Sequence, residues 1–431
     1  MATTEHHTVI IVGGGPAGLP LAIVLGGWHP FYKNSSTLFQ KRYPNLDGYL
    51  SNCETSLLGL DFNQLLRKGI LPVDLFRLLH HPSQKFRGLE EIALEFHPKE
   101  ALDYLLISRE PVGGLWNNVP ENLLTLSPGQ WMEFAFYPLA KYIEEKKIPI
   151  DVNDLILKRN LLDYYHRVPG YFGQSDHIRT QENIVRIEPH EMGFLLTAQD
   201  IVRKTTTCYT CKYLIYAAGQ RSIKRSLNIP GENLPFVIDQ YTKPEDFPGK
   251  QIIIVGGGRS ADWAATELHD AEKQIYYIMR QPSQRHWKLI NDSRWLPYYA
   301  RLANIIESLS PNFQTIYQSY VQKIEENGLV TFTTNGQEHN LKVDQVILEI
   351  GGVADYSLFK GFPPFQITEK YDQYRFQVHQ LATHPHNHES IDIPNLYAGG
   401  YLAQGLGLVV IAMHGSTYAI AGDILQKENR V

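Results

Sequence analysis

Cysteine is scarce in this chain of 431 residues, which contains only Cys53, Cys208 and Cys211. Three cysteines are too few for the disulfide framework of a small secreted protein, and they fit a reducing compartment. The opening residues MATTEHH are polar, so we expect no signal peptide. These features predict a cytoplasmic protein that is stabilised by buried apolar cores.

Long apolar runs and an excess of basic charge are also missing. The run GLGLVVIAM is too short to cross a bilayer, and the chain ends in the polar residues QKENRV, so we expect no membrane span. The formal net charge of −5 argues against a nucleic-acid partner. With 43% apolar and 20% charged residues, the composition is typical of a soluble globular protein, and the length predicts two or three domains. The oligomeric state stays open.

The segment TVIIVGGGPAG, residues 8–18, has the pattern of a buried strand followed by a dinucleotide-binding turn. The first glycine permits the tight turn, the second lets the backbone approach a pyrophosphate, and the third allows close packing of helix on strand. The helix is expected from Ala17 to about Leu25, with its free N–H groups facing the phosphates. Candidate nucleotide contacts in this turn are Gly13, Gly15, Pro16, Ala17 and Gly18.

An acidic residue is missing where this fingerprint normally has one. Residues 19–46 contain no Asp or Glu, although a carboxylate about 20 residues beyond the last glycine usually holds the ribose hydroxyls. We interpret residues from about 28 to 100, which include two amphipathic helical patches, as an insertion. Strand-like sequence resumes at LDYLLISRE, residues 102–110, so Glu110 is predicted to be the displaced ribose carboxylate. Asp47 is the second candidate.

Two further segments match an FAD-binding domain. PVGGLW, residues 111–116, follows Glu110 directly, and a Gly-Gly-x-Trp at this place recurs in FAD-dependent oxygenases. CKYLIYAAGQ, residues 211–220, is a strand that ends in small residues, as at the close of the first FAD segment of two-dinucleotide flavoproteins. The candidate FAD contacts added here are Gly114, Trp116, Trp131 and Gly219.

A second strand, glycine turn and helix lie in GKQIIIVGGGRSADWAATEL, residues 249–268. The next strand, KQIYYIMRQP, ends in Arg280 rather than an acid, and an arginine there can accept the 2′-phosphate of NADP, with Arg285 nearby. A hairpin with an Asn335-Gly336 turn is expected before Gly352. The candidate NADPH contacts are Gly256, Gly258, Arg259, Ser260 and Arg280.

These elements predict an α/β fold with two Rossmann-type dinucleotide-binding domains, the second inserted in the first. The expected boundaries are 1–235 for the first FAD segment, 236–352 for the NADPH domain and 353–431 for the returning FAD segment. An acid after the first turn and an arginine after the second predict FAD and then NADPH. The reduced flavin could react with O2, reduce a disulfide, or serve a plain reductase or oxidase.

The sequence resembles the class B flavin-dependent monooxygenases and, more closely, the oxidative-stress-induced growth inhibitor family within that superfamily. The stretches that carry the resemblance are LGGWHPFY, PVGGLWNNVPENLLTLSPGQWMEF, GGGRSADWA, MRQPSQ with RWLPYYARL, and NLYAGGYLAQGLGLVVIAMHG. The resemblance implies bound FAD, NADPH as reductant, and oxygenation of a heteroatom or carbonyl of a small organic substrate by O2. It leaves the substrate open.

The chain departs from the wider monooxygenase pattern at two positions. Leu126 stands where those enzymes have an Asn near the flavin, and Val237 stands near the place of their linker His. Stabilisation of oxygen at the reduced flavin therefore cannot be carried over from those two residues. Ser127, Gln130 and bound NADP⁺ are the candidates for that role.

Other readings compete with an oxygenase. Cys208 and Cys211 could form a redox pair, but residues i and i+3 of a strand point to opposite faces. The histidines of HPHNH, residues 384–388, are interpreted as a solvated loop, so no metal is predicted. The helical patches of the insertion either bury an apolar stripe or form a lid or tunnel. The alternative function is a non-oxygenating NADPH-dependent reductase or oxidase, or a nucleotide-sensing binding protein.

Overall fold

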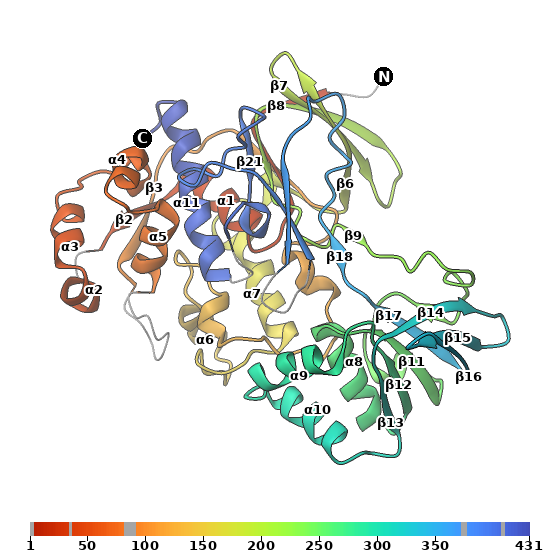
Figure 1. Cartoon of the computed structure of the whole chain (residues 1–431). Helices are drawn as coiled ribbons and strands as arrows, with labels where there is room; N and C mark the ends of the chain where they lie inside the picture. The colour runs from red at the N-terminus through yellow and green to blue at the C-terminus, as the bar shows by residue number, and fades with distance from the viewer. Residues whose placement is uncertain (1–3, 34–36, 82–91, 372–376, 407–409) are drawn as a thin grey trace.

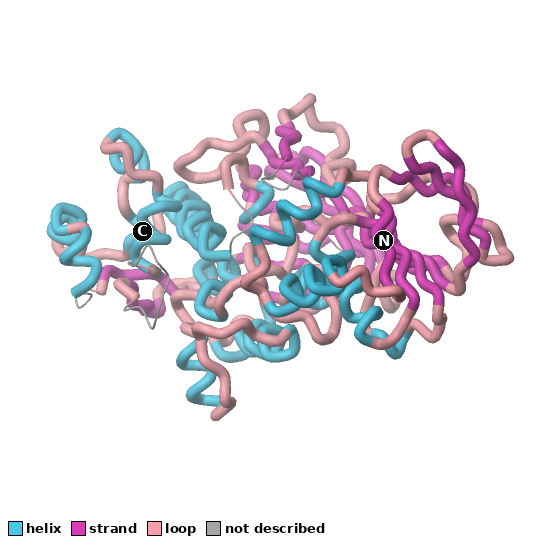
Figure 2. The backbone as a smooth tube through the Cα atoms, turned by 60° about the horizontal axis from the view of Figure 1, so that its bottom comes forward, coloured by secondary structure: helices cyan, strands magenta, loops and turns pink. Residues whose placement is uncertain are grey.

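The computed structural model describes residues 4–33, 37–81, 92–371, 377–406 and 410–431. These residues form a mixed α/β fold around two separate sheets, and helices pack beside both (Figure 1). In the view of Figure 2 the helices gather at one end of the molecule and most strands at the other.

The first sheet is assembled from both ends of the chain. Its strand order is β5-β4-β1-β8-β7-β6, and β21 pairs with the end of β8. Strands β5, β4, β1, β8 and β21 run parallel, and β7 is antiparallel to both of its neighbours, β8 and β6. The bounds are β1 Thr4–Val12, β4 Tyr104–Ile107, β5 Ile178–Arg179, β6 Glu182–His190, β7 Gly193–Asp200, β8 Thr206–Tyr216 and β21 Leu396–Ala398. Val9, Ile10 and Ile11 are fully buried, as a parallel strand covered on both faces requires.

Helices of the first unit pack around the glycine turn that follows β1. Helix α1, Gly18–Leu25, is buried along its whole length, so its sequence is apolar on every side. The other helices of this unit are α6 Leu139–Lys146, α7 Lys158–Tyr171 and the long α11 Val410–Lys427. Of the apolar run that ends in α11, residues 407–409 lie outside the described part of the chain. No helix among the described residues combines the length and the apolar character needed to cross a bilayer.

The inserted segment forms a helical cap on α11 (Figure 1, red to orange). Its elements are β2 Trp28–Tyr32, α2 Thr37–Arg42, α3 Pro44–Leu50, η1 Leu57–Gly59, α4 Phe62–Arg67, α5 Pro72–His80 and β3 Leu94–Pro98. Helices α4 and α5 match the two expected helical patches, and their apolar stripes are buried against α1 and α11. The antiparallel pair β2–β3 was not expected from the sequence. Residues 34–36 and 82–91 of this segment lie outside the described part.

The second sheet is entirely parallel, with the order β10-β17-β11-β12-β13. Its elements are β10 Val237–Ile238, β11 Gln251–Gly256, α8 Arg259–Asp270, β12 Gln274–Ile278, α9 Ser283–Asp292, α10 Pro297–Glu307, β13 Phe313–Ile316 and β17 Gln345–Glu349. A meander of β14 Ser319–Ile324, β15 Leu329–Thr334 and β16 Gln337–Lys342 packs beside it. Asn335 and Gly336 both have positive φ angles, 51° and 82°, so the expected hairpin turn is confirmed.

Two linkers connect the units, and they pair with each other. Strand β9, Ile223–Lys224, leaves the first unit and is antiparallel to β18, Gly352–Val353, on the returning chain. The return then forms β19 Ile367–Tyr371 and β20 Gln377–Leu381 before β21 joins the first sheet. The strands of the second sheet therefore lie between β8 and β21 in the sequence. The domain boundaries at 235 and 352 stay a prediction.

The ends of several elements differ from the sequence-based expectation. Strand β4 ends at Ile107 instead of Glu110, because Ile107 pairs with Val12 and β1 has no further residue to offer. Strand β12 ends at Ile278, two residues before Arg280, where its neighbour β13 also ends, at Ile316. Helix α1 begins at Gly18, one residue later than expected.

The packing of α5 on α11 requires a glycine at one contact. A Cβ atom on Gly415 would lie 2.1 Å from the backbone oxygen of Val73, so Gly415→Ala is expected to lower the free energy of unfolding by about 1–3 kcal/mol. Gly48 lies in α3 with open space around it, so Gly48→Ala should raise that free energy by up to about 1 kcal/mol. Thermal unfolding of both variants checks this, and equal shifts would contradict the packing described.

Candidate functional site

The first glycine turn lies at the carboxyl edge of the first sheet, between β1 and α1. The N–H of Gly13 donates to the carbonyl of Ile107 over 2.8 Å, and Gly13 has a φ of 112°. A Cβ atom on Gly13 would lie 2.4 Å from the oxygen of Ala217, and one on Gly18 would lie 1.9 Å from the oxygen of Gly13. These two glycines are therefore required by the protein itself.

Gly15 differs from its neighbours because the protein leaves space beside it. A Cβ atom there would meet only the Cα atom of Gly114, at an ordinary contact distance of 3.6 Å. The N–H groups of Gly18 and Leu19 donate to the carbonyl of Gly15, which places it directly before α1. The first turn of α1 contains no acidic residue that would oppose an anion. A pyrophosphate close to Gly15 thus fits the residues present.

The segment that contains Gly114 is held against the turn by the backbone. The N–H of Gly113 donates to the carbonyl of Gly14 over 2.8 Å. Gly114 has a φ of 55°, and a Cβ atom on it would lie 2.7 Å from the Cα atom of Gly15. Trp116 follows in η2, Gly114–Asn118, and is half-buried against the cluster around α1.

Two more segments reach the same edge from distant parts of the chain. The N–H of Ala217, just after β8, donates to the carbonyl of Val12, and a Cβ atom on Gly399 would lie 2.8 Å from the Cβ of Ala217. Gly219 has a φ of 79° and open space beside it. The ends of β1, β4, β8 and β21 therefore meet at the carboxyl edge, where parallel α/β sheets bind ligands.

The position that follows β4 is occupied by Ser108. This residue is 5% exposed, and its Cβ and Oγ atoms would both lie 3.1 Å from a Cβ on Gly14. Glu110 lies two residues further on and forms an ion pair with Arg109 at 3.2 Å. Asp47 lies in α3 of the inserted segment and accepts a hydrogen bond from Tyr32. The ribose role of Glu110 stays a prediction, and Ser108 is the candidate that the sequence pattern did not reveal.

The residues proposed to lie near the flavin have different neighbours. Ser127 donates to the sulfur of Met132 over 3.6 Å, and its carbonyl accepts from Thr125. Gln130, 3% exposed, donates to Asn153 over 3.3 Å. Trp131 is half-buried and belongs with Gln130 to η3, Gly129–Met132. No described contact joins Ser127 to Gln130, so a shared role for them stays a prediction.

The second glycine turn lies at the carboxyl edge of the second sheet, between β11 and α8. A Cβ atom on Gly256 would lie 2.6 Å from both the Cβ of Ala261 and the oxygen of Glu349, so this glycine is structural. Gly258 is the N-cap residue of α8, and Arg259 and Ser260 are its first two residues. The guanidinium of Arg259 donates to the hydroxyl of Ser293 over 3.1 Å and lies over the ring of Tyr299.

A fully buried carboxylate anchors this helix. Asp262 accepts hydrogen bonds from the hydroxyls of Tyr277 and Tyr299 at 2.8 and 2.9 Å, and from His286 at 2.7 Å. Burial raises the pKa of both tyrosines well above the ordinary value, so both hydroxyls keep their protons. The network joins α8, β12, α9 and α10, and it fixes the start of α8 beneath the turn. Sequence reasoning missed it because its members are far apart in the chain.

Two arginines lie close together beside the second turn. Arg280 is exposed and directly precedes Gln281, the side chain of which donates to the carbonyl of Gly257 in the turn over 2.9 Å. Arg225, on the linker after β9, donates to Gln377 over 2.7 Å. Burial and, to a smaller extent, the nearby positive charge of Arg280 lower the pKa of Arg225. Neighbouring guanidinium groups favour a bound anion, and Arg225 was not predicted from the sequence.

The cysteines lie away from both glycine turns. Cys208 and Cys211 are both in β8 with free thiols, and their partners on β1 are Thr4 and His7 in the amino half of that strand. At about 3.3 Å per residue, Cys211 lies roughly 17 Å and Cys208 roughly 26 Å before the carboxyl end of β8. Cys53 follows α3, and burial raises its pKa.

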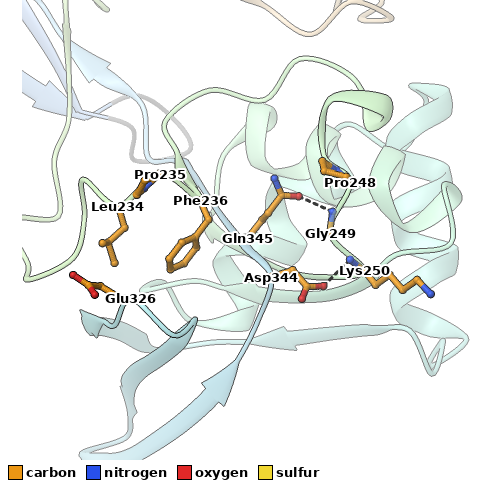
Figure 3. A pocket seen from close by; sticks show the side chains of 9 residues that line it. All are labelled: Leu234, Pro235, Phe236, Pro248, Gly249, Lys250, Glu326, Asp344 and Gln345. Atoms are coloured by element: carbon orange, nitrogen blue, oxygen red, sulfur yellow. Dashed lines mark hydrogen bonds between the residues drawn. The ribbon is translucent and has the colours of Figure 1, made fainter.

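A wide cavity of about 950 Å³ in the second unit is not part of this arrangement (Figure 3). It is lined by Phe236, Gly249 and Gln345, which precede β10 and β11 or begin β17. Gln345 accepts from the N–H of Gly249 and Asp344 accepts from that of Lys250, as Figure 3 shows. The cavity therefore opens at the amino ends of the strands, opposite to the second glycine turn.

Two solved structures with a similar fold are a disulfide reductase and an N-hydroxylase. The bacillithiol disulfide reductase Bdr of Staphylococcus aureus matches with a TM-score of 0.65 and 18% identity, over 98% of this chain and 99% of its own. The ornithine N-hydroxylase of Kutzneria sp. 744 matches with a TM-score of 0.60 and 12% identity, over 98% of this chain and all of its own. The two matches show the fold of the chain. Its class, a flavin-dependent oxidoreductase that binds a flavin and NAD(P), follows from the family model that matches most of the chain.

The model of the family described as pyridine nucleotide-disulphide oxidoreductase matches residues 88–400, so the chain belongs to this family. Mouse oxidative stress-induced growth inhibitor 1 is 24% identical over the whole of this chain and 97% of its own length. The resemblance to that group, expected from the sequence, is thereby confirmed.

The different surroundings of Gly15 and Gly18 give a test of the first turn. Gly15→Ala should fold normally but be purified without flavin, because its methyl group would occupy the space meant for the pyrophosphate. Gly18→Ala should fold poorly whether or not flavin is added, and Gly48→Ala should retain flavin. The flavin-to-protein absorbance ratio and circular dichroism measure this. Yellow Gly15→Ala protein with a full complement of flavin would refute the assignment.

Proposed function

We propose that the protein is an FAD- and NADPH-dependent monooxygenase that uses O2 to oxygenate a heteroatom or carbonyl of a small organic substrate. The observation that carries this proposal is the pair of glycine turns, each at the carboxyl edge of its own parallel sheet. In this proposal the chain has two Rossmann-type domains, with residues 236–352 inserted between 1–235 and 353–431. The cytoplasmic location expected from the low cysteine content belongs to the same proposal.

FAD is assigned to the first turn. The open space at Gly15 and the uncompensated amino end of α1 fit a pyrophosphate, with Gly114 close on the other side. Glu110 or Ser108 would hold the ribose, since both follow β4. When bound, FAD would accept a hydride from NADPH and pass the electrons to O2. Trp116, Trp131 and Gly219 remain the proposed contacts at the margins of this site.

NADPH is assigned to the second turn because of the charge beside it. Gly258 and the amino end of α8 would receive the pyrophosphate, and Arg280 and Arg225 would hold the 2′-phosphate. The guanidinium of Arg259 donates to Ser293. The contact that we propose for Arg259 with the coenzyme would therefore be made by its backbone at the start of α8. Ser260 and Gly256 complete the proposed turn.

The positions of the cysteines favour oxygen over a thiol as electron acceptor. A dithiol that takes electrons from a flavin must lie next to it, at the carboxyl edge of the first sheet. Cys208 lies in the amino half of β8 and Cys211 at its middle, and burial raises the pKa of Cys211, which disfavours a reactive thiolate. Ser127, Gln130 and retained NADP⁺ are the proposed groups that protect the activated oxygen.

The second candidate function is a non-oxygenating NADPH-dependent reductase or oxidase. Its support is the similarity to Bdr, the name of which describes a disulfide reductase. In this function the reduced flavin would pass its electrons to a separate molecule, so no cysteine of the chain would be needed. A protein that binds both nucleotides as a signal, without turnover, is the weaker form of the same alternative.

The coenzyme assignment predicts unequal effects on NADPH and NADH. Arg280→Ala should raise the NADPH concentration needed for half-maximal flavin reduction by about 10- to 100-fold, with little effect on NADH. Arg225→Ala should act in the same direction, and the double variant should lose the preference for NADPH. Arg301→Ala is the matched control, because Arg301 pairs with Asp270 on the surface of the same unit. An equal loss with both coenzymes would contradict the assignment.

The oxygenase and reductase functions can be distinguished by measuring which product receives the electrons of NADPH. An oxygenase should consume NADPH faster with its substrate present, and the added turnover should form oxygenated product rather than hydrogen peroxide. A panel of amines, thioethers and ketones can be screened with NADPH, O2 and peroxide measured together. If every electron pair appears as peroxide or in an artificial acceptor for all compounds, the reductase or oxidase reading replaces the oxygenase.

A further inference from the structure

A buried cluster of two histidines and a glutamate lies outside both proposed nucleotide sites. His80 ends α5, His81 follows it, and Glu133 follows η3. Their side chains are 0%, 1% and 7% exposed. One ligand atom from each residue lies within 4.8 Å of the other two, and neither proposed nucleotide site uses them.

The separations of these atoms suit a common metal ion. Nε2 of His80 lies 3.2 Å from Oε1 of Glu133, and Nε2 of His81 lies 4.0 Å from the same oxygen. Metal–ligand bonds of 2.0–2.1 Å in a tetrahedral zinc site separate neighbouring ligand atoms by about 3.3 Å. The His80 distance, at present a hydrogen bond, matches this value. The His81 distance exceeds it by about 0.7 Å, so the His81 ring would move toward Glu133 on binding the ion.

The backbone directs the three side chains toward one another. Residues next to each other on a helix normally point about 100° apart. His81 lies just beyond the last turn of α5, with φ −128° and ψ 83°, and its ring stacks on that of His80 at 4.0 Å. Both Nε2 atoms can therefore approach one carboxylate oxygen.

Glu133 is held from behind by a helix. Its Oε2 accepts the N–H of Leu139, the first residue of α6, over 2.8 Å. The other oxygen, Oε1, is turned toward the two histidines. Hydrogen bonds of this kind orient metal-binding carboxylates.

The donor atoms of the cluster are also suited to a cation. Two imidazole nitrogens and one carboxylate oxygen can share a divalent ion once these groups have released their protons. A cavity of about 60 Å³, lined by His81, Glu133 and Gln130, has room for water as the remaining ligand.

We propose that His80, His81 and Glu133 form a zinc site that joins the inserted helix α5 to η3 and α6. Two imidazoles and one carboxylate are a ligand set for Zn²⁺, whereas Mg²⁺ and Ca²⁺ prefer oxygen ligands alone. A small cavity lined in part by His81, Glu133 and Gln130 adjoins the three residues. Zinc binding here would fix the inserted segment beside the LTLSPGQWME segment of the first unit. The proposal does not depend on the oxygenase assignment.

Metal analysis of the full-length protein, purified without a histidine tag, tests the site. After removal of metal with a chelator, the protein is titrated with ZnSO4 and the bound zinc is counted by mass spectrometry. We expect one zinc ion per chain and an increase in the melting temperature. Glu133→Gln should lower the zinc affinity by more than about 100-fold, because it removes the anionic ligand. Gln keeps an acceptor for the Leu139 N–H, so this variant should still fold.

Two further variants complete the test. His81→Asn should lose zinc in the same way as Glu133→Gln. His97→Asn is the matched control, because His97 and Glu95 form an exposed pair at 3.0 Å outside this cluster, and it should bind zinc like the wild type. Wild-type protein that takes up no zinc above the buffer level would overturn the proposal. Zinc bound with unchanged affinity by Glu133→Gln and His81→Asn would overturn it as well.

Discussion

The arrangement of the first unit depends on one backbone contact, between Gly18 at the start of α1 and the carbonyl of Gly13 at the end of β1. A Cβ atom at this place would lie 1.9 Å from the oxygen, so only glycine lets the helix return onto the strand. Because α1 is then buried on all sides, its neighbours are determined too: α11 packs on it, and the inserted helices pack on α11. The same contact leaves the amino end of α1 free at the edge where the ends of four strands meet.

The inserted segment shows how a long insertion can leave such a site undisturbed. It leaves the first unit after α1 and returns before β4, and the antiparallel pair β2–β3 brings its two ends together. Lys99 donates its N–H to the carbonyl of Gly27 over 2.8 Å, so the entry and the exit lie side by side. Strands β1 and β4 pair in parallel, from Val9 with Tyr104 to Val12 with Ile107, although the whole segment lies between them in the sequence. The cost in loop entropy grows only slowly with the length of such an excursion.

Two buried carboxylates, Asp262 and Glu133, have very different partners. Asp262 accepts from two tyrosine hydroxyls and a histidine, and it therefore fixes the helix beneath the second glycine turn. Glu133 accepts one backbone N–H on one oxygen, and its other oxygen is hydrogen-bonded to His80 and faces His81. The first carboxylate stabilises a rigid scaffold, and the second has the surroundings of a ligand. Two carboxylates that are buried to a similar degree can thus have different roles, depending on which hydrogen-bond donors surround them.

The sequence by itself determined the two glycine turns, the insertion after α1 and the Asn335-Gly336 hairpin. Each of these depends on the conformations of consecutive residues, which the residue types reveal: β-branched runs for strands, and glycine or asparagine where φ is positive. Only the tertiary structure decided that Ser108 directly follows β4, that Arg225 lies beside Arg280, and that two histidines approach a glutamate far along the chain. These placements depend on the residues at which paired strands end and on contacts between segments that are far apart in the sequence. Neither leaves a local pattern in the sequence, because residues that are far apart along the chain can be close in space.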